Sequence, residues 1–236
     1  MDSARRTALV AGLFYLITFA ASIPAVFLLA PVLNHPGYIV SAGADTRVLW
    51  GCFLDLINAL ACIGTAVALF PVVRRQNEGA ALGFVTSRML EAAIIVIGVV
   101  SLLAVVTLRQ DLAGAPGTDT ASLITTGRAL VAVRDWTFLL GPGLMPGINA
   151  LLLGYLMYRS GLVPRLIPVL GLIGAPLLIA SAIAALFRGN HPIPVLAVIA
   201  TVPIFVWELS LGLWLAIKGF RPSPITAGMA VPTGGA

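Results

Sequence analysis

The residues of this sequence best suited to chemistry are six ionisable side chains placed inside long apolar runs. They are Asp55, Arg88, Glu91, Arg134, Asp135 and Glu208. Each would cost about 2.5 to 3.5 kcal/mol at the centre of a membrane helix, so we expect them to face a bundle interior and to pair there. Four carboxyl groups accompany two guanidinium groups, and arginine stays protonated. The set therefore contains either neutral acids or a site for compensating positive charge, such as a proton or another cation.

Counting about 1.5 Å per residue from the expected helix ends sorts these side chains into two levels. An inner polar tier, about 11 to 16 Å from one membrane face, contains Arg88, Glu91 and Glu208. An outer polar tier, nearer the other face, contains Asp55, Asn58, Arg134 and Asp135. Arg88 and Glu91 are three residues apart and share a helix face, whereas Arg134 and Asp135 point about 100° apart and should address different neighbours.

A cluster of glycines and prolines predicts a break in the helix that follows the outer tier. Its members are Gly141, Pro142, Gly143, Pro146 and Gly147. Proline removes an amide donor and leaves a carbonyl without its helical partner. Such backbone survives at membrane depth only where protein or water covers it. The cluster forms either a tightly packed kink or a broken helix at a cavity of the kind found in transporters.

Other intramembrane chemistries lack the side chains they need. His35 and His191 both lie in loops, which excludes haem ligation inside the bundle and leaves two solvated histidines or a surface zinc site with Asp45 or Asp111. Lys218 is the only lysine and lies at a helix end, so a mid-membrane Schiff base is excluded. There is no Cys-x-x-Cys, Gly-x-Ser-x-Gly or phosphate-binding loop. We therefore expect no cofactor and no metal.

The elements that must position the charged residues are membrane helices. The chain has 236 residues, of which 59% are hydrophobic and 10% are charged, far below the roughly 25% charged residues of soluble domains. A span needs about 20 apolar helical residues, and six runs qualify, at about 8–32, 48–70, 80–108, 129–158, 166–187 and 193–217. Because these runs lack the alternating polarity of barrel strands, the expected fold is all-α, an integral membrane bundle of six transmembrane helices.

The basic residues predict the orientation of the bundle. Eight of them lie at the ends shared with the two termini and four at the opposite ends, so both termini should be cytoplasmic. Residues 1–220 then form one six-helix domain, and residues 221–236, rich in Pro, Gly, Ser and Thr, form a disordered cytoplasmic tail. In the loop at 109–128, Thr118 or Asp119 should cap a helix that begins near residue 120.

Three short motifs resemble a bacterial six-helix family, DUF4386, whose name denotes a domain of unknown function. They are Arg88-x-x-Glu91, the stretch Tyr-Leu-Met-Tyr-Arg-Ser-Gly-Leu-Val-Pro at 155–164 followed by Arg165, and Gly171-Leu-Ile-Gly174. The resemblance extends to about Phe220. It implies a multi-pass protein of a bacterial cell membrane and supplies neither an activity nor a site residue.

Three functional hypotheses follow from these patterns. The first is a structural or partner-interacting membrane protein whose interior charges stabilise the bundle. The second is a small proton- or cation-linked transporter or channel that uses the polar tiers and the broken helix. The third is an intramembrane acid-base enzyme, although no catalytic residue is identified. The partners expected are the lipid bilayer and an ion or small molecule, and not nucleic acid, because the 14 basic residues form no basic face; the oligomeric state stays open.

Overall fold

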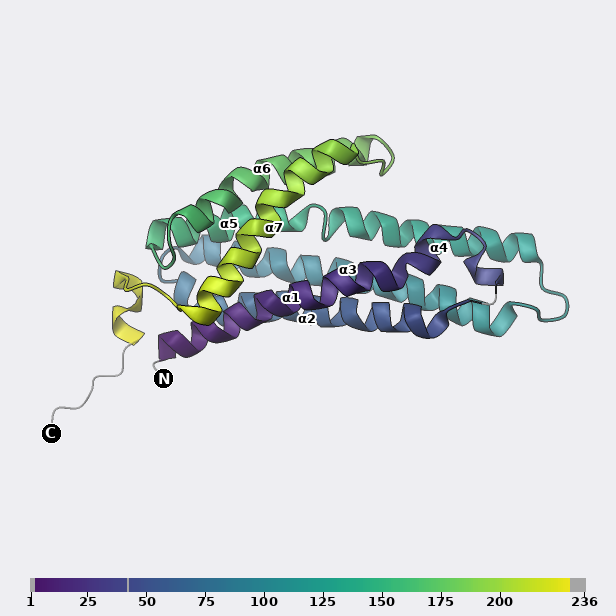
Figure 1. Cartoon of the computed structure of the whole chain (residues 1–236), viewed down its shortest axis with the longest axis horizontal. Helices are drawn as coiled ribbons and strands as arrows, with labels where there is room; N and C mark the ends of the chain where they lie inside the picture. The colour runs from purple at the N-terminus through teal and green to yellow at the C-terminus, as the bar shows by residue number, and fades with distance from the viewer. Residues whose placement is uncertain (1–2, 42, 230–236) are drawn as a thin grey trace.

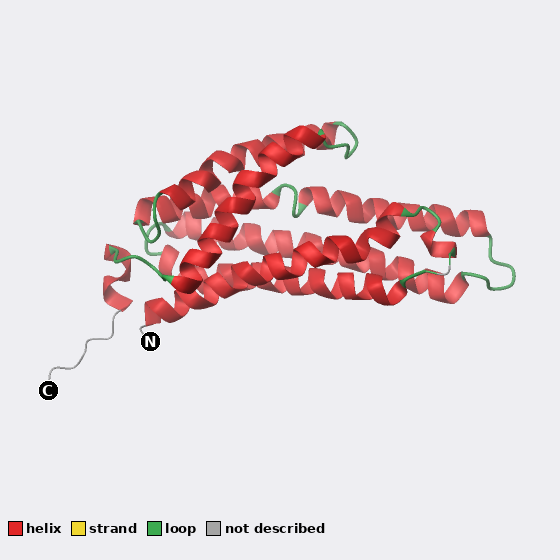
Figure 2. Ribbon diagram, viewed as in Figure 1, coloured by secondary structure: helices red, strands yellow, loops and turns green. Residues whose placement is uncertain are grey.

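The computed structural model describes residues 3–41 and 43–229, and every regular element in these ranges is helical (Figures 1 and 2). The elements are α1 (Ser3–Asn34), η1 (Tyr38–Val40), α2 (Asp45–Val73), α3 (Glu78–Leu112), α4 (Thr120–Leu140), α5 (Met145–Ser160), α6 (Leu166–Phe187), α7 (Pro194–Ile217) and η2 (Pro224–Met229). Six segments are long and apolar enough to cross a membrane, with α4 and α5 together forming one of them. The predicted all-α fold with six candidate spans is confirmed.

Side-chain caps fix two of the helix starts. The Asn77 side chain accepts a hydrogen bond from the Ala80 amide at 2.9 Å, and the Asp119 side chain accepts one from the Ala121 amide at 3.1 Å. Such caps satisfy amide groups that have no partner within the first helical turn. The start of α4 at Thr120, predicted from the sequence, is therefore confirmed, and Asp119 is the residue that caps it.

The break between α4 and α5 occupies residues 141–144, within the predicted cluster. Pro146 and Gly147, which were predicted to belong to the break, instead lie in the first turn of α5. Proline is tolerated there because the first amide groups of a helix have no helical partner. Figure 2 shows the break as a loop between two helices that continue in roughly the same direction.

Small residues let the helices approach closely. A Cβ on Gly12 of α1 would lie 2.5 Å from the Ala216 amide nitrogen of α7, and one on Gly171 of α6 would lie 2.7 Å from the Trp207 ring of α7. Arg5 adds a polar link, because its guanidinium donates to the Leu215 carbonyl at 3.1 Å and to the carbonyls that follow it in α7. These contacts bind α7 to α1 on one side and to α6 on the other.

The helices differ in length, and this difference shapes the molecule. Helices α1, α2 and α3 contain 32, 29 and 35 residues, or about 48, 44 and 52 Å at 1.5 Å per residue. Helices α6 and α7 contain 22 and 24 residues, or about 33 and 36 Å, close to the roughly 30 Å hydrocarbon core. The α6–α7 hairpin therefore stops short of the end reached by α1–α4 (Figure 1). We call that end, formed by η1 and the α3–α4 loop, the distal end.

The start of α1 and the last described element, η2, both lie at the opposite end of the bundle (Figure 1). Residues 221–229 differ from the expected disordered tail, because they fold back onto the helices. The Ser223 hydroxyl donates to the Ser160 carbonyl at 2.7 Å, the Arg221 amide donates to the Leu162 carbonyl at 2.8 Å, and Arg75 donates to the Ile225 carbonyl at 3.1 Å. The remainder of the predicted tail, 230–236, lies outside the described residues.

Candidate functional site

The three residues of the inner polar tier meet around one guanidinium group. Arg88 of α3 donates to Glu91 Oε2 at 3.0 Å and to Glu208 Oε1 of α7 at 2.6 Å. The side chains of Arg88 and Glu91 are 2% and 5% exposed, whereas that of Glu208 is 14% exposed. The first contact follows from the spacing within one helix. The second spans the bundle interior, because α7 packs against α1 and α6 and the long Arg88 and Glu208 side chains reach across to each other. Two carboxyl groups thus share one permanent positive charge.

Neighbouring helices add polar and aromatic partners to this group. Asn149 of α5 donates from Nδ2 to Glu91 Oε2 at 2.7 Å and accepts from the Ser87 hydroxyl at 2.5 Å. The Tyr15 ring of α1 lies 5.2 Å from the Arg88 guanidinium carbon, within the range of a cation–π contact. We call Tyr15, Arg88, Glu91, Asn149 and Glu208 the central cluster. It joins four helices, α1, α3, α5 and α7.

A cavity of about 270 Å³ borders the central cluster. Arg88, Glu91 and Glu208 line it. The other lining residues come from α1, α2, α4, α5, α6 and α7 and from the break between α4 and α5. Pro142, Gly143 and Pro146 of the predicted break cluster lie on its wall. Arg88 lies ten residues into α3 and Glu208 nine residues before the end of α7, or about 15 and 14 Å from one end of the bundle. The cavity therefore lies near the middle of the apolar layer.

The outer polar tier forms a second buried contact. Arg134 of α4 donates from Nη2 to Asp55 Oδ2 of α2 at 2.8 Å, with side-chain exposures of 5% and 8%. The guanidinium carbon lies 5.2 Å from the Phe138 ring centre. Nε and Nη1 of Arg134 are buried and have no hydrogen-bond partner among the described residues. This ion pair links α4 to α2 on the side of the break that faces the distal end.

Two other residues of the outer tier lie elsewhere. Asn58 lines the central cavity together with Arg88 and Glu208, so it belongs with the inner residues. Asp135 is exposed and, within the described part of the chain, takes part in no ion pair or side-chain hydrogen bond. It points away from Arg134, as their 100° separation predicts. Its lack of a partner departs from the expectation that every intramembrane charge would pair.

A further ion pair closes the distal end, and the sequence arguments did not identify it. Arg109 at the end of α3 pairs with Asp45 at the start of α2. Asp45 also accepts from the Tyr38 hydroxyl at 2.7 Å and from Gln110 at 3.1 Å. Arg109 donates to the Ser41 carbonyl at 2.8 Å. From the sequence, Arg109 was used only as a marker of orientation, and Asp45 was considered only as a possible ligand of a surface zinc site.

The residues that the sequence analysis placed outside the bundle core offer no metal site. Across 3–41 and 43–229 there is no group of three or more His, Cys, Asp or Glu side chains that could hold a metal ion. His35 and His191 are both exposed. Cys52 and Cys62 are buried and free, and Cys62 borders the central cavity. The polar groups on the cavity wall are carboxyl, guanidinium, amide, hydroxyl and thiol groups.

These features define a multi-pass, all-helical membrane protein with a polar cavity at its centre. The sequence model of the family described as Domain of unknown function (DUF4386) matches residues 10–219. The chain belongs to this family, and the resemblance seen in its short motifs is confirmed. Neither the comparison with curated proteins nor that with solved structures gives a match.

Proposed function

We propose that the chain is a small transporter linked to protons or another cation, with the central cavity as its binding site. The observation that carries this proposal is the position of Arg88, Glu91 and Glu208 on the wall of a 270 Å³ cavity beside a broken helix. A purely structural ion-pair network would be expected to exclude such a space, because interiors are packed with few voids larger than a water molecule.

The charges of the central cluster favour a cationic ligand. When both carboxyl groups are ionised, Glu91 and Glu208 outnumber Arg88 by one negative charge. Glu91 accepts from both Arg88 and Asn149, whereas the side chain of Glu208 accepts only from Arg88 among the described residues. Glu208 is also the more exposed of the two carboxyl groups. Glu208 is therefore the group that exchanges a proton for a bound cation.

The helix break supplies a second kind of ligand. Pro146 has no amide hydrogen for the Pro142 carbonyl four residues earlier. The Gly147 amide donates to the Leu144 carbonyl at 3.1 Å, which withholds it from Gly143. Pro142 and Gly143 both line the cavity, and carbonyls released from a helix are common cation ligands in transporters. A small cation would thus contact the Glu208 carboxylate on one side and backbone oxygens on the other.

The competing hypothesis is that the same charges act only to hold the bundle together. The contact between Arg88 and Glu208 links α3 to α7, and that between Asn149 and Glu91 links α5 to α3. Removing one member of a buried, hydrogen-bonded pair is expected to cost about 3 to 5 kcal/mol. Stability and ligand response must therefore be measured on the same variants.

Purified protein in liposomes containing a pH-sensitive dye separates the two hypotheses. The probes are sodium, potassium and tetramethylammonium chloride, each added outside at equal ionic strength. We expect at least one cation to drive proton release with wild type and with Glu78→Gln, an exposed control at the start of α3. Glu208→Gln should abolish this release, and because Arg88 keeps its ion pair with Glu91, the Tm should stay near that of wild type. If no cation releases protons and Glu208→Gln lowers Tm, the charges are structural.

The site of action that we propose is a bacterial cell membrane with both termini in the cytoplasm. The excess of basic residues at the ends shared with the termini supports this orientation. The start of α1 and η2 lie at the same end of the bundle (Figure 1), which supports placing both termini on one side. A cysteine introduced at Gly117, in the distal loop, should be labelled by an impermeant maleimide in intact cells. Labelling that requires cell lysis would reverse the orientation.

A further inference from the structure

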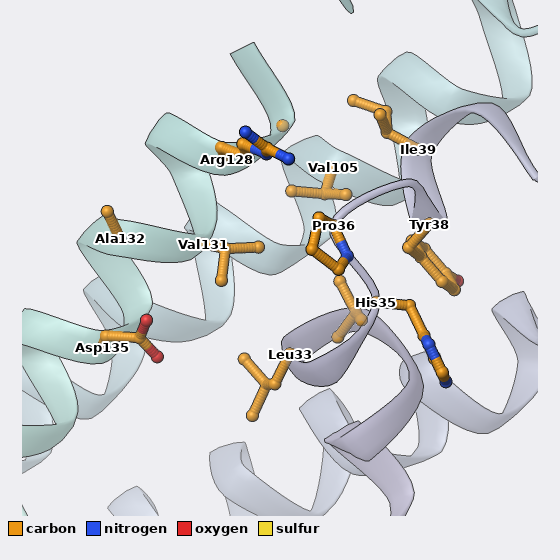
Figure 3. A pocket seen from close by; sticks show the side chains of 12 residues that line it. Leu33, His35, Pro36, Tyr38, Ile39, Val105, Arg128, Val131, Ala132 and Asp135 are labelled. Carbon is orange, nitrogen blue, oxygen red and sulfur yellow. The ribbon is translucent and has the colours of Figure 1, made fainter. Parts of the chain in front are cut away.

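A second pocket, separate from the central cavity, lies at the distal end of the bundle. It has a volume of about 260 Å³ and lies between α4, the end of α1, η1 and α3 (Figure 3). The residues that form its apolar walls include Leu33, Ile39, Val105 and Val131. Gly127 lets α4 approach η1, because a Cβ there would lie 3.0 Å from the Ile39 side chain.

Two opposite charges lie on the α4 wall of this distal pocket. Arg128 and Asp135 are seven residues apart, so they share a helix face and are separated by about 10 Å along the axis. Both are exposed. Throughout 3–41 and 43–229, neither side chain takes part in an ion pair or a side-chain hydrogen bond. They are too far apart along the helix to neutralise each other at close range.

The two other titratable side chains of the pocket, His35 and Tyr38, do not join this pair. The Tyr38 hydroxyl donates to Asp45 at 2.7 Å. Figure 3 shows the His35 ring on the far side of Pro36 from Asp135, on the same side of the pocket as Tyr38. The next charge along α4, Arg134, is bound to Asp55 on another face. Asp135 and Arg128 are thus two isolated charges at the two ends of one apolar surface.

We propose that the distal pocket binds a zwitterionic small molecule with an apolar body. Its ammonium group would contact Asp135 and its carboxylate would contact Arg128, with the apolar part against Leu33 and Val131. The spacing selects the length of the ligand, because about 10 Å corresponds to three extended amino-acid residues at 3.3 to 3.6 Å each. A short apolar peptide fits this spacing, whereas a single amino acid is too short to reach both charges.

The test uses the purified full chain in detergent and trialanine as the probe, with affinity measured by saturation-transfer NMR or calorimetry. We expect trialanine to bind and alanine to bind at least about tenfold more weakly. Trialanine blocked as the N-acetyl amide should bind as weakly as alanine. Asp135→Asn and Arg128→Gln should each weaken the binding of trialanine by a similar factor. Asp111→Asn, an exposed carboxyl outside the pocket, should leave the affinity unchanged.

A charge exchange gives the sharper test, because a zwitterion can bind in either direction. Arg128→Asp alone should abolish binding, and adding Asp135→Arg should restore it with the peptide reversed. Binding of the blocked peptide as tightly as trialanine, or no recovery in a double variant of unchanged Tm, would overturn the proposal. The inference is independent of the central cavity: Asp135→Asn should leave cation-driven proton release intact, and Glu208→Gln should leave trialanine binding intact.

Discussion

The ion pair between Arg134 and Asp55 predicts an asymmetric response to the loss of either partner. Asp55→Asn leaves a buried guanidinium that cannot lose its proton and whose Nε and Nη1 already lack partners among the described residues. We expect this variant to lose about 3 to 5 kcal/mol of unfolding free energy. Arg134→Met leaves a carboxyl group that can bind a proton, so its cost should be smaller, about 1 to 3 kcal/mol.

The double replacement should recover most of the loss. Methionine keeps the unbranched stem of Arg134, which passes beside Gly98 of α3, and leucine matches Asp55 in its number of side-chain heavy atoms and in its branch at Cγ. Replacing a buried pair by apolar residues of similar volume is often neutral or stabilising. We therefore expect Asp55→Asn to have the lowest unfolding free energy and Arg134→Met the next lowest. The double variant Asp55→Leu/Arg134→Met should have an unfolding free energy near that of wild type.

Unfolding by SDS in mixed micelles, followed by tryptophan fluorescence, would measure these differences. Asp111→Asn serves as the matched control, because it makes the same chemical change at an exposed site. An Arg134→Met variant as unstable as Asp55→Asn would contradict the argument, since it would mean that an isolated carboxyl group is no easier to accommodate than an isolated guanidinium. A loss below about 1 kcal/mol in both would place the pair in the range of solvent-exposed ion pairs.

Three further changes test other contacts of the bundle. Gly171→Ala would place a methyl group 2.7 Å from the Trp207 ring, and we expect overpacking to cost about 1 to 3 kcal/mol by SDS unfolding. Arg5→Ala removes a charged donor from the last carbonyls of α7 and should lower stability by about 1.5 to 3 kcal/mol, whereas the exposed Arg6→Ala should have little effect in a thermal assay. Burial and a hydrogen bond to a carboxylate raise the pKa of Tyr38 above its ordinary value, which is near 10. The folded chain therefore keeps a proton that the unfolded chain loses, and the unfolding free energy should fall as pH rises above about 10. Tyr38→Phe should show a smaller fall, and a pH profile identical to that of wild type would show that the phenol does not titrate with unfolding.

The positions of the helices follow from the sequence alone, because the length of an apolar run and the residue that caps a helix are local properties. Runs of about 20 apolar residues can satisfy their backbone in a bilayer only as helices, and Asp119 marked the start of α4 before any packing was known. The pairing of Arg88 with Glu91 was also local, since three residues separate them on one helix.

Tertiary packing decided which distant charges meet. Depth along a helix placed Arg88 and Glu208 at one level, but only the packing of α7 on α1 and α6 turns Glu208 towards Arg88 and brings the two side chains to 2.6 Å. Depth alone also assigned Asn58 to the outer tier, whereas the rotation of α2 turns its side chain to the central cavity. Asp135 illustrates the same limit, because its lack of a partner depends on which helices surround α4. Rotation and neighbour choice depend on contacts between helices, and a count of residues along one helix does not contain them.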